Sequence, residues 1–322
     1  MPRTRDVPDS RTMSEEIQLF NAGFRTGKGK QSAVLVKRFR GLGDVLQVLP
    51  ALKALKGKYG PKTKLVFGTS PIFFPLLRRF DFIDRLVNEK QAEVKGRYDL
   101  VVDLQNKVDF LPICCEAPRQ DLFARLLELN PQCYCPRFDF PILKSEIVKA
   151  RTILQRAGWR GEKLFGLHLM AYSAIRTWPV ERNLELVERL SDREGWKILI
   201  LESHAVREQF RKFDHVIVPD KTALIDLLGL LSFCEYLVCP DSGIMHLAGL
   251  LQIPSVALFG PIPPEFRIGY YPKTTGLSLR VDCNPCWDWQ THACHKRPHY
   301  RQCLKKITVE MVINTLEDIG CF

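Results

Sequence analysis

The chain has 322 residues, of which 46% are hydrophobic and 26% are charged, and its formal net charge at pH 7 is +11. This length and apolar content predict two globular domains of ordinary size, each with an ample core. No run of about 18 apolar residues occurs, so we expect no membrane-spanning helix. The first residues carry scattered charges and no apolar segment, so we expect no secretory signal and a cytoplasmic protein.

The excess of basic residues lies in two stretches, 1–60 and 273–306. Within the first, residues 1–30 predict a disordered, cationic lead-in. Such stretches suit an anionic partner, which can be nucleic acid, lipid phosphate in a peripheral membrane contact, or a phosphorylated glycan. The alternative is that these basic residues only keep the protein soluble and belong to a flexible terminus, which explains the charge equally well. The composition leaves both interpretations open, and it leaves the oligomeric state open.

From residue 33 onward, short β-branched runs alternate with amphipathic runs. In the first half, strand-like runs occupy 33–39, 64–70 and 98–105, and helical spacing occupies 45–60 and 71–80. After a polar, helix-like connector at 144–159, strand-like runs occupy 164–170, 196–203, 214–219, 235–241 and 255–261, and helical runs occupy 181–195, 222–234 and 243–252. The alternation predicts two α/β domains, each doubly wound around a parallel sheet, over 31–155 and 156–322. A ligand is expected in the cleft between them.

The run CPDSGIMHLAG, residues 239–249, joins a buried strand to a helix. Asp241 stands at the carboxyl end of the strand, where open α/β sheets bind ligands, and Ser242 stands where a helix N-cap would stand. Gly243 allows a close backbone approach, and the N–H groups of the helix start suit a phosphate that His246 can also face. A hydrolase elbow needs G-x-S-x-G, which P-D-S-G-I does not match. A plain strand–cap–helix junction with a core histidine is the alternative.

A second strand–helix turn, FRGLGDVLQVLPAL, carries Asp44 beside Gly43. Here the chain resembles glycosyltransferase family 9, the heptosyltransferase-like enzymes, whose opening turn and helix read roughly GDVLLTLPALRALK. Further similar segments follow in the same order: YDLVVDLQN (98–106), TWPVERNLELVERL (177–190) and PDSGIMHLAGLLQIPSVALFGP (240–261). The resemblance therefore extends over most of the chain, from about 33 to 310.

The resemblance implies the GT-B fold, in which two Rossmann-like domains face a cleft. It implies an inverting glycosyltransferase that moves a sugar, such as heptose, from a nucleotide-diphosphate sugar that is ADP-heptose-like, with no catalytic metal. The acceptor would lie in the N-terminal domain and the donor in the C-terminal domain. Neither the donor sugar nor the acceptor is specified, and lipopolysaccharide core, other glycans, protein hydroxyls and modified nucleic acid all stay open.

By position in this pattern, Asp44 is the candidate general base for the acceptor hydroxyl; a helix-terminal acid favoured by the helix dipole is the alternative. Arg176 stands near where the family has a basic residue on the donor phosphate, and a guanidinium can hold a diphosphate bidentately. A solvated loop cation is the alternative for Arg176, and a core histidine is the alternative for His168. The resemblance assigns to the donor site Arg176, Asp241, Ser242, Gly243, His246, His168 and Gly260.

Three segments around the expected donor site depart from the family pattern. After His168 the family reads Pro-Gly-Ala, whereas Leu-Met-Ala occupies 169–171 here. Ile262 replaces the threonine that usually follows Phe-Gly-Pro, and Glu-Ser at 202–203 replaces a pair of glycines. These changes bear on the identity of the donor rather than on the fold.

Residues 282–303, DCNPCWDWQTHACHKRPHYRQC, form a Cys-rich loop with the pattern C-x2-C-x7-C-x8-C, made by Cys283, Cys286, Cys294 and Cys303. In a reducing compartment, clustered cysteines indicate a metal rather than disulfides. Four thiolates suit a tetrahedral structural site for zinc or iron, with no open position. The spacing is not that of a common zinc finger, so unligated cysteines are the alternative. The protein-heptosylating branch of the family has a similar four-cysteine, iron-binding segment.

A protein of another class fits part of the sequence: a nucleic-acid-binding protein on a transferase scaffold. The basic N-terminus and the aromatic residues of the Cys-rich loop, Trp287, Trp289 and Tyr300, support it. A glycosyltransferase with an anionic acceptor, including modified nucleic acid, would combine both functions. The intact Asp44 and Asp241 favour the enzyme.

Overall fold

The chain forms two compact units, Met1–Phe138 and Asp139–Phe322, here called unit 1 and unit 2. The computed structural model describes residues 32–93, 98–105, 117–130, 134–202, 205–220, 222–283, 286, 294 and 300–321. The predicted lead-in, 1–30, and most of the Cys-rich loop lie outside these residues. Both units are α/β with a parallel sheet, which confirms the predicted fold class. In the described parts of the chain, no helix is both long and apolar enough to cross a bilayer.

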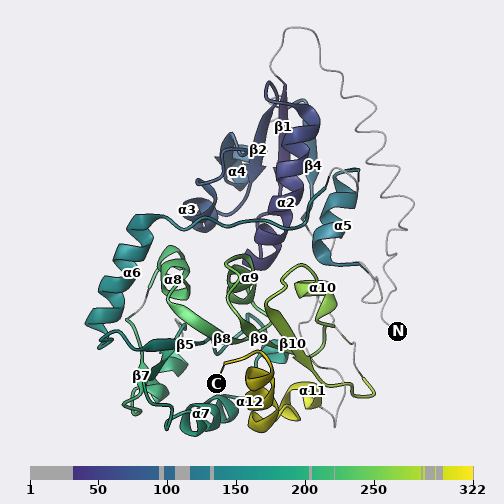
Figure 1. Ribbon diagram of the computed structural model, residues 1–322. Coiled ribbons are helices and arrows are strands. Elements are labelled where there is room, and N and C mark those ends of the chain that lie inside the picture. Colours follow the sequence, from purple (N-terminus) through teal and green to yellow (C-terminus); the bar gives the residue numbers. More distant parts are fainter. Residues whose placement is uncertain are drawn as a thin grey trace. The chain divides into compact units, whose positions relative to one another are not determined.

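Unit 1 is built on a four-stranded parallel sheet in the order β3-β2-β1-β4 (Figure 1). Its strands are β1 (Ala33–Lys37), β2 (Lys64–Gly68), β3 (Arg85–Val87) and β4 (Leu100–Asp103). Its helices are α2 (Leu42–Tyr59), α3 (Phe74–Leu77), α4 (Glu89–Ala92) and α5 (Arg119–Leu126), with a 3-10 turn at Pro71–Phe73. The chain runs outward from β1 to β3 and then returns to pair β4 with β1. The winding direction therefore reverses between β1 and β4.

Helix α2 begins at Leu42, earlier than the start predicted at residue 45. Gly41 is its N-cap, with a φ of 78°, a backbone conformation that L side chains rarely adopt. The helix thus starts inside the glycine turn, and Asp44 lies in its first turn, where the helix dipole favours a carboxylate. Apolar side chains such as Leu46 and Leu49 are fully buried, and α5 packs beside α2.

Unit 2 is built on a six-stranded parallel sheet in the order β10-β9-β8-β5-β6-β7. Its strands are β5 (Lys163–Leu167), β6 (Trp196–Ile200), β7 (Val216–Ile217), β8 (Cys234–Pro240), β9 (Ser255–Phe259) and β10 (Thr274–Ser278). Its helices are α6 (Lys144–Arg156), α7 (Val180–Arg189), α8 (Leu224–Leu231), α9 (Gly243–Leu250), α10 (Glu265–Ile268), α11 (Gln302–Lys305) and α12 (Val309–Asp318), with 3-10 turns at Ala174–Arg176 and Ala205–Phe210. Helices α7 and α12 lie on one face of the sheet, and α8 and α9 lie on the other (Figure 1). The winding direction reverses between β5 and β8.

The boundary between the units falls before α6, whereas the sequence placed it near residue 155, inside this helix. The reason is the packing of α6 on α8. A Cβ added to Gly229 would lie 2.7 Å from the carbonyl oxygen of Glu146 and 3.0 Å from the Cβ of Ala150. Only a glycine in α8 lets the two helices approach this closely, so the segment interpreted as a connector is an integral helix of unit 2.

The hydrophobic core of unit 2 is closed by residues that the sequence analysis left unassigned. Val312 and Leu316 of α12 are fully buried in the same cluster as Phe165 and Trp178. The indole Nε1 of Trp178 donates a hydrogen bond to the carbonyl oxygen of Ile307 at 3.1 Å. This contact ties the segment in front of α7 to the segment in front of α12.

Candidate functional site

The first candidate site lies in unit 1, at the carboxyl ends of β1 and β4, where the winding direction reverses. Its centre is Asp44, which forms ion pairs with two guanidinium groups. Arg38 Nη2 contacts Asp44 Oδ2, and Arg119 Nε lies 2.6 Å from Asp44 Oδ1. All three side chains are largely buried. A crevice at such a reversal is where open α/β sheets bind their ligands.

Three different elements place these groups. Arg38 directly follows β1; its N–H donates to the carbonyl oxygen of Gly68 at 2.8 Å, and its Nη1 donates to that of Leu104 at 3.2 Å. Arg119 is the first residue of α5, which packs beside α2. Gly41 has no side chain, and a Cβ there would lie 2.8 Å from Asp44 Oδ2. The glycine turn therefore supplies the space that the carboxylate occupies.

This arrangement suits a positioned base. A carboxylate has two oxygens with about four acceptor sites, so it can accept a hydroxyl donor beside its guanidinium partners. The cations also give the site a net positive charge, which favours an anionic ligand beside the base. Asp44 was predicted from the sequence, but neither arginine was. Arg38 could have been suspected from its place at a strand end, whereas no local pattern marks Arg119.

The second candidate site lies in unit 2, at the carboxyl ends of β5 and β8. Asp241 directly follows β8 and is 2% exposed. Arg176 Nη1 donates to the Asp241 carbonyl oxygen at 3.2 Å and lies 3.4 Å from its Oδ2, and Arg267 Nε lies 3.7 Å from the same Oδ2. Ser242 caps α9, as predicted, and its Oγ accepts from the N–H of Met245 at 3.5 Å. Two cations and a helix N-terminus thus surround one carboxylate, which leaves an excess of positive charge.

The ionisation of Asp241 reflects this environment. Burial alone would raise the pKa of the carboxyl group, but the charges of Arg267 and Arg176, and then His246, lower the pKa below its ordinary value. Asp241 is therefore a carboxylate at neutral pH and holds both guanidinium groups in place. Arg267, on the short helix α10, is a residue that the sequence analysis missed, because nothing in its surroundings marks it.

The two histidines have specific partners inside unit 2. His246 is 2% exposed, and its Nδ1 lies 3.1 Å from the hydroxyl oxygen of Tyr271. Burial raises the pKa of Tyr271, so this hydroxyl stays protonated. His168 Nδ1 lies 2.7 Å from the carbonyl oxygen of Leu201 and 3.6 Å from Glu202 Oε2. Each ring is thus oriented by a hydrogen bond at Nδ1.

The segments that depart from the family pattern are built into this site. Glu202 is buried, and its Oε2 accepts from the N–H of Met170 at 3.1 Å. Glu202 stands where the family usually has a glycine. Through this hydrogen bond it orders the loop at 169–171, where the family usually has Pro-Gly-Ala. Gly260 lies against the segment that carries Arg176: a Cβ there would lie 3.0 Å from the carbonyl oxygen of Ile175. Gly260 acts in the described structure by allowing this close packing.

The four predicted metal ligands, Cys283, Cys286, Cys294 and Cys303, belong to unit 2. Burial, followed by the neighbouring thiols of Cys283, Cys303 and Cys294, raises the pKa of Cys286 to about 11. The backbone N–H of Arg301 donates to Cys294 Sγ at 3.4 Å. Among the described residues, no three His, Cys, Asp or Glu side chains are arranged so as to hold a metal ion. The metal site therefore stays a prediction.

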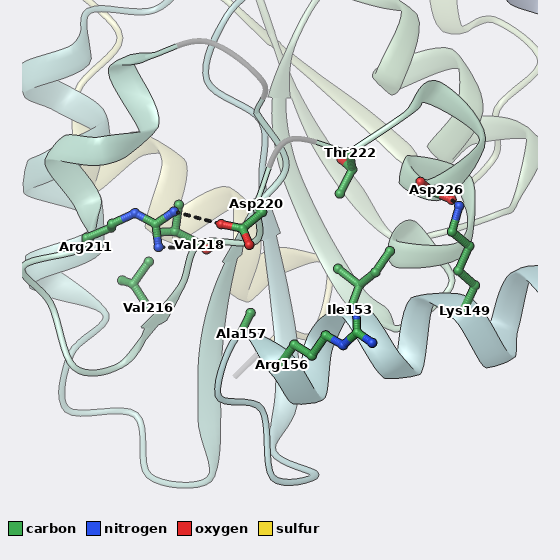
Figure 2. A pocket seen from close by; sticks show the side chains of 10 residues that line it. All are labelled: Lys149, Ile153, Arg156, Ala157, Arg211, Val216, Val218, Asp220, Thr222 and Asp226. Carbon is green, nitrogen blue, oxygen red and sulfur yellow. Dashed lines mark hydrogen bonds and ion pairs between the residues drawn. The ribbon is translucent and has the colours of Figure 1, made fainter.

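A polar groove of about 560 Å³ also opens on unit 2, beside the edge strand β7 (Figure 2). None of the predicted site residues lines it. Lys149 of α6 pairs with Asp226 of α8 at 2.6 Å, and Arg211 donates to the carbonyl oxygen of Val218 at 3.1 Å. Arg156, on α6, is exposed at its rim. The positive and negative side chains that line the groove largely compensate one another, so we assign no function to this groove.

Two parallel α/β units, one with a buried carboxylate and one with a cationic strand–helix junction, form the architecture of GT-B-type glycosyltransferases. The model of glycosyltransferase family 9 (heptosyltransferase) matches residues 127–296, and the chain belongs to this family. It is 25% identical over 305 residues to lipopolysaccharide heptosyltransferase 1 of Pseudomonas aeruginosa, a match covering 79% of this chain and 85% of that relative.

Two solved structures show the same fold. Escherichia coli ADP-heptose LPS heptosyltransferase II superimposes with a TM-score of 0.70 at 18% identity, over 89% of this chain and 98% of that chain. The iron-containing dodecameric glycosyltransferase TibC of enterotoxigenic E. coli superimposes with a TM-score of 0.68 at 15% identity, over 91% of this chain and 77% of that chain. The prediction of a family 9 enzyme is confirmed, and the alternative of a nucleic-acid-binding protein finds no support in these similarities.

Proposed function

We propose that this glycosyltransferase transfers a sugar, with heptose the favoured candidate, from a nucleotide-diphosphate donor to a hydroxyl of an anionic glycan such as a lipopolysaccharide core. The observation that carries the donor assignment is the junction after β8, where Arg176, Arg267 and the N-terminus of α9 gather around Asp241. Such a junction suits a diphosphate. An ADP-heptose-like donor is supported by the similarity to E. coli ADP-heptose LPS heptosyltransferase II.

The reaction we propose is a single displacement with inversion at the anomeric carbon. Asp44 accepts the proton of the acceptor hydroxyl while the hydroxyl oxygen bonds to the anomeric carbon. The bond from that carbon to the diphosphate oxygen breaks, and the nucleoside diphosphate leaves with the electron pair. Arg176 and Arg267 stabilise the developing negative charge, in the role that a metal ion plays in other transferases. In this proposal unit 1 binds the acceptor and unit 2 the donor, and the enzyme acts in the cytoplasm.

The acceptor assignment rests on the charge around Asp44. Arg38 and Arg119 would face a ligand that reaches the carboxylate, which favours an acceptor with acid groups. The Pseudomonas relative is a lipopolysaccharide heptosyltransferase, which supports a lipopolysaccharide acceptor. Anionic protein or nucleic-acid acceptors would present the same chemistry, so the acceptor has to be determined by assay.

The test is Asp44→Asn, which keeps the size of the side chain and removes the base. We expect transfer from ADP-heptose to a lipopolysaccharide core acceptor to fall by about 10²–10⁴-fold. ADP binding, measured by calorimetry, should stay unchanged. Asp103→Asn is the matched control, because Asp103 also ends a strand in unit 1 and pairs with Lys37 at 2.7 Å. Transfer within a few-fold of the parent enzyme would remove Asp44 from its proposed role.

We also propose that the four cysteines of the Cys-rich loop hold a structural zinc or iron ion. The support is the C-x2-C-x7-C-x8-C pattern of the loop and the N–H···S hydrogen bond from Arg301 to Cys294, a contact that stabilises a thiolate. TibC is named as iron-containing. Elemental analysis of the purified protein should find about one zinc or iron per chain. A protein without metal, in which all four thiols react with a thiol reagent, would refute the site.

A further inference from the structure

Arg176 is carried by a short loop, residues 171–177, that is held tightly from within. The hydroxyl of Thr177 accepts a hydrogen bond from the N–H of Ala171 at 3.1 Å. It also lies 3.1 Å from the carbonyl oxygen of Ser173, to which it can donate. Thr177 and Ser173 are both buried, so these bonds are shielded from water. The position of Arg176 is therefore set by the placement of Thr177, its neighbour in the chain.

A second set of contacts holds the same loop from the C-terminal end of the chain. Arg301 Nη2 donates to the carbonyl oxygen of Thr177, and Trp178 Nε1 donates to the carbonyl oxygen of Ile307. A Cβ on Gly260 would lie 3.0 Å both from the carbonyl oxygen of Ile175 and from Cγ of Leu304 in α11. The loop therefore packs against Gly260, the residue after β9, and is held by the guanidinium of Arg301.

Arg301 has a second connection, which leads to the cysteines. Its backbone N–H donates to Cys294 Sγ at 3.4 Å. Its φ of 58° is left-handed, and it forms the N-cap of α11, the helix that contains Cys303. On the opposite side, the N–H of Cys286 donates to the carbonyl oxygen of Pro261, next to Gly260, at 3.1 Å. The cysteines are therefore connected to the loop at 171–177 through Arg301, and to the segment after β9, which packs on that loop, through Cys286.

We propose that Arg301 is a positioning residue that couples the cysteine cluster to the placement of Arg176, and thereby sets the affinity for the nucleoside diphosphate. This inference rests on the proposed function of the junction at Asp241. The backbone of Arg301 is anchored by the thiol of Cys294, and its guanidinium fixes the Thr177 carbonyl. Arg176 is then already ordered before the ligand binds. Binding therefore loses less side-chain conformational entropy.

The coupling makes a specific prediction for binding. Arg301→Met keeps most of the side-chain volume but removes the donor to Thr177, so we expect the Kd for ADP to rise about tenfold, equivalent to about 1.4 kcal/mol. Arg301→Lys retains one donor and should restore part of the affinity. Arg156→Met is the matched control, because Arg156 is an exposed arginine of the same unit, at the groove beside β7. Calorimetry with ADP as the probe measures all three variants.

Because Arg301 acts through Arg176, the two substitutions should not add. Arg176→Met alone should weaken ADP binding, and the double variant Arg176→Met/Arg301→Met should bind no more weakly than Arg176→Met. An additive loss, or an Arg301→Met variant that binds within twofold of the parent, would overturn the coupling. Unchanged ADP binding in Arg176→Met would instead contradict the proposed donor site.

A second measurement tests the contact without any ligand. Hydrogen–deuterium exchange should show faster amide exchange in residues 171–178 of Arg301→Met, and no change there in Arg156→Met. Unchanged amide exchange in residues 171–178 of Arg301→Met would overturn the proposal. Because this measurement uses no ligand, its outcome does not depend on whether the protein binds ADP.

Discussion

Gly41→Ala is the substitution for which the structure predicts two separable effects. The φ of 78° at Gly41 is costly for any residue with a Cβ, by about 1–3 kcal/mol. The new Cβ would also lie 2.8 Å from Asp44 Oδ2, too close for the carboxylate to keep its place. Displacing Asp44 disturbs its ion pair with Arg38 and moves the proposed base, so we expect kcat to fall about 10–100-fold.

Gly60→Ala separates the two effects. Gly60, at the other end of α2, has a φ of 79°, and no atom lies within 4 Å of an added Cβ. It should therefore lose about 1–3 kcal/mol of stability through backbone strain alone and keep its kcat. Amide exchange in α2 reports unit 1, whereas tryptophan fluorescence reports unit 2, where all five tryptophans lie. Equal losses of kcat in the two variants would show that strain, rather than displacement of Asp44, controls the rate, and would refute the reasoning.

Two further predictions concern unit 2. Arg267→Met should raise the Kd for ADP about tenfold, since it removes one charge from the proposed diphosphate site; calorimetry beside Arg156→Met tests this, and an unchanged Kd would leave Arg267 a structural residue. Because the folded-state pKa of Asp241 is lowered, its contribution to stability is present above an ordinary aspartate pKa of about 4 and is lost as the pH falls through the lower folded-state value. Asp241→Asn should therefore be less stable than the parent at pH 7, and urea unfolding should show the difference narrowing below about pH 4. A difference that is constant with pH would mean that Asp241 titrates alike in both states.

Much of the architecture follows from local patterns in the sequence. The alternation of β-branched and amphipathic runs is set by residues a few positions apart, so it predicted two parallel α/β units and the main strands. The cap at Ser242 is equally local, because an N-cap bonds to an N–H only three residues away. Strand β10, TTGLS, and helix α12 were not predicted: the first carries one large apolar residue, and the second follows the Cys-rich loop, where no element was assigned from the sequence.

The partners within each candidate site were decided only by the tertiary structure. Strand order places the turns after β1 and β4 side by side in unit 1, and those after β5 and β8 in unit 2, and no local pattern encodes that order. Arginine side chains then reach across elements: Arg119 comes from α5 to Asp44, and Arg267 from α10 to Asp241. The sequence by itself determined the two acids and the cap, because each belongs to a strand–helix turn. The cations that surround them come from distant segments, and folding alone brings them within reach.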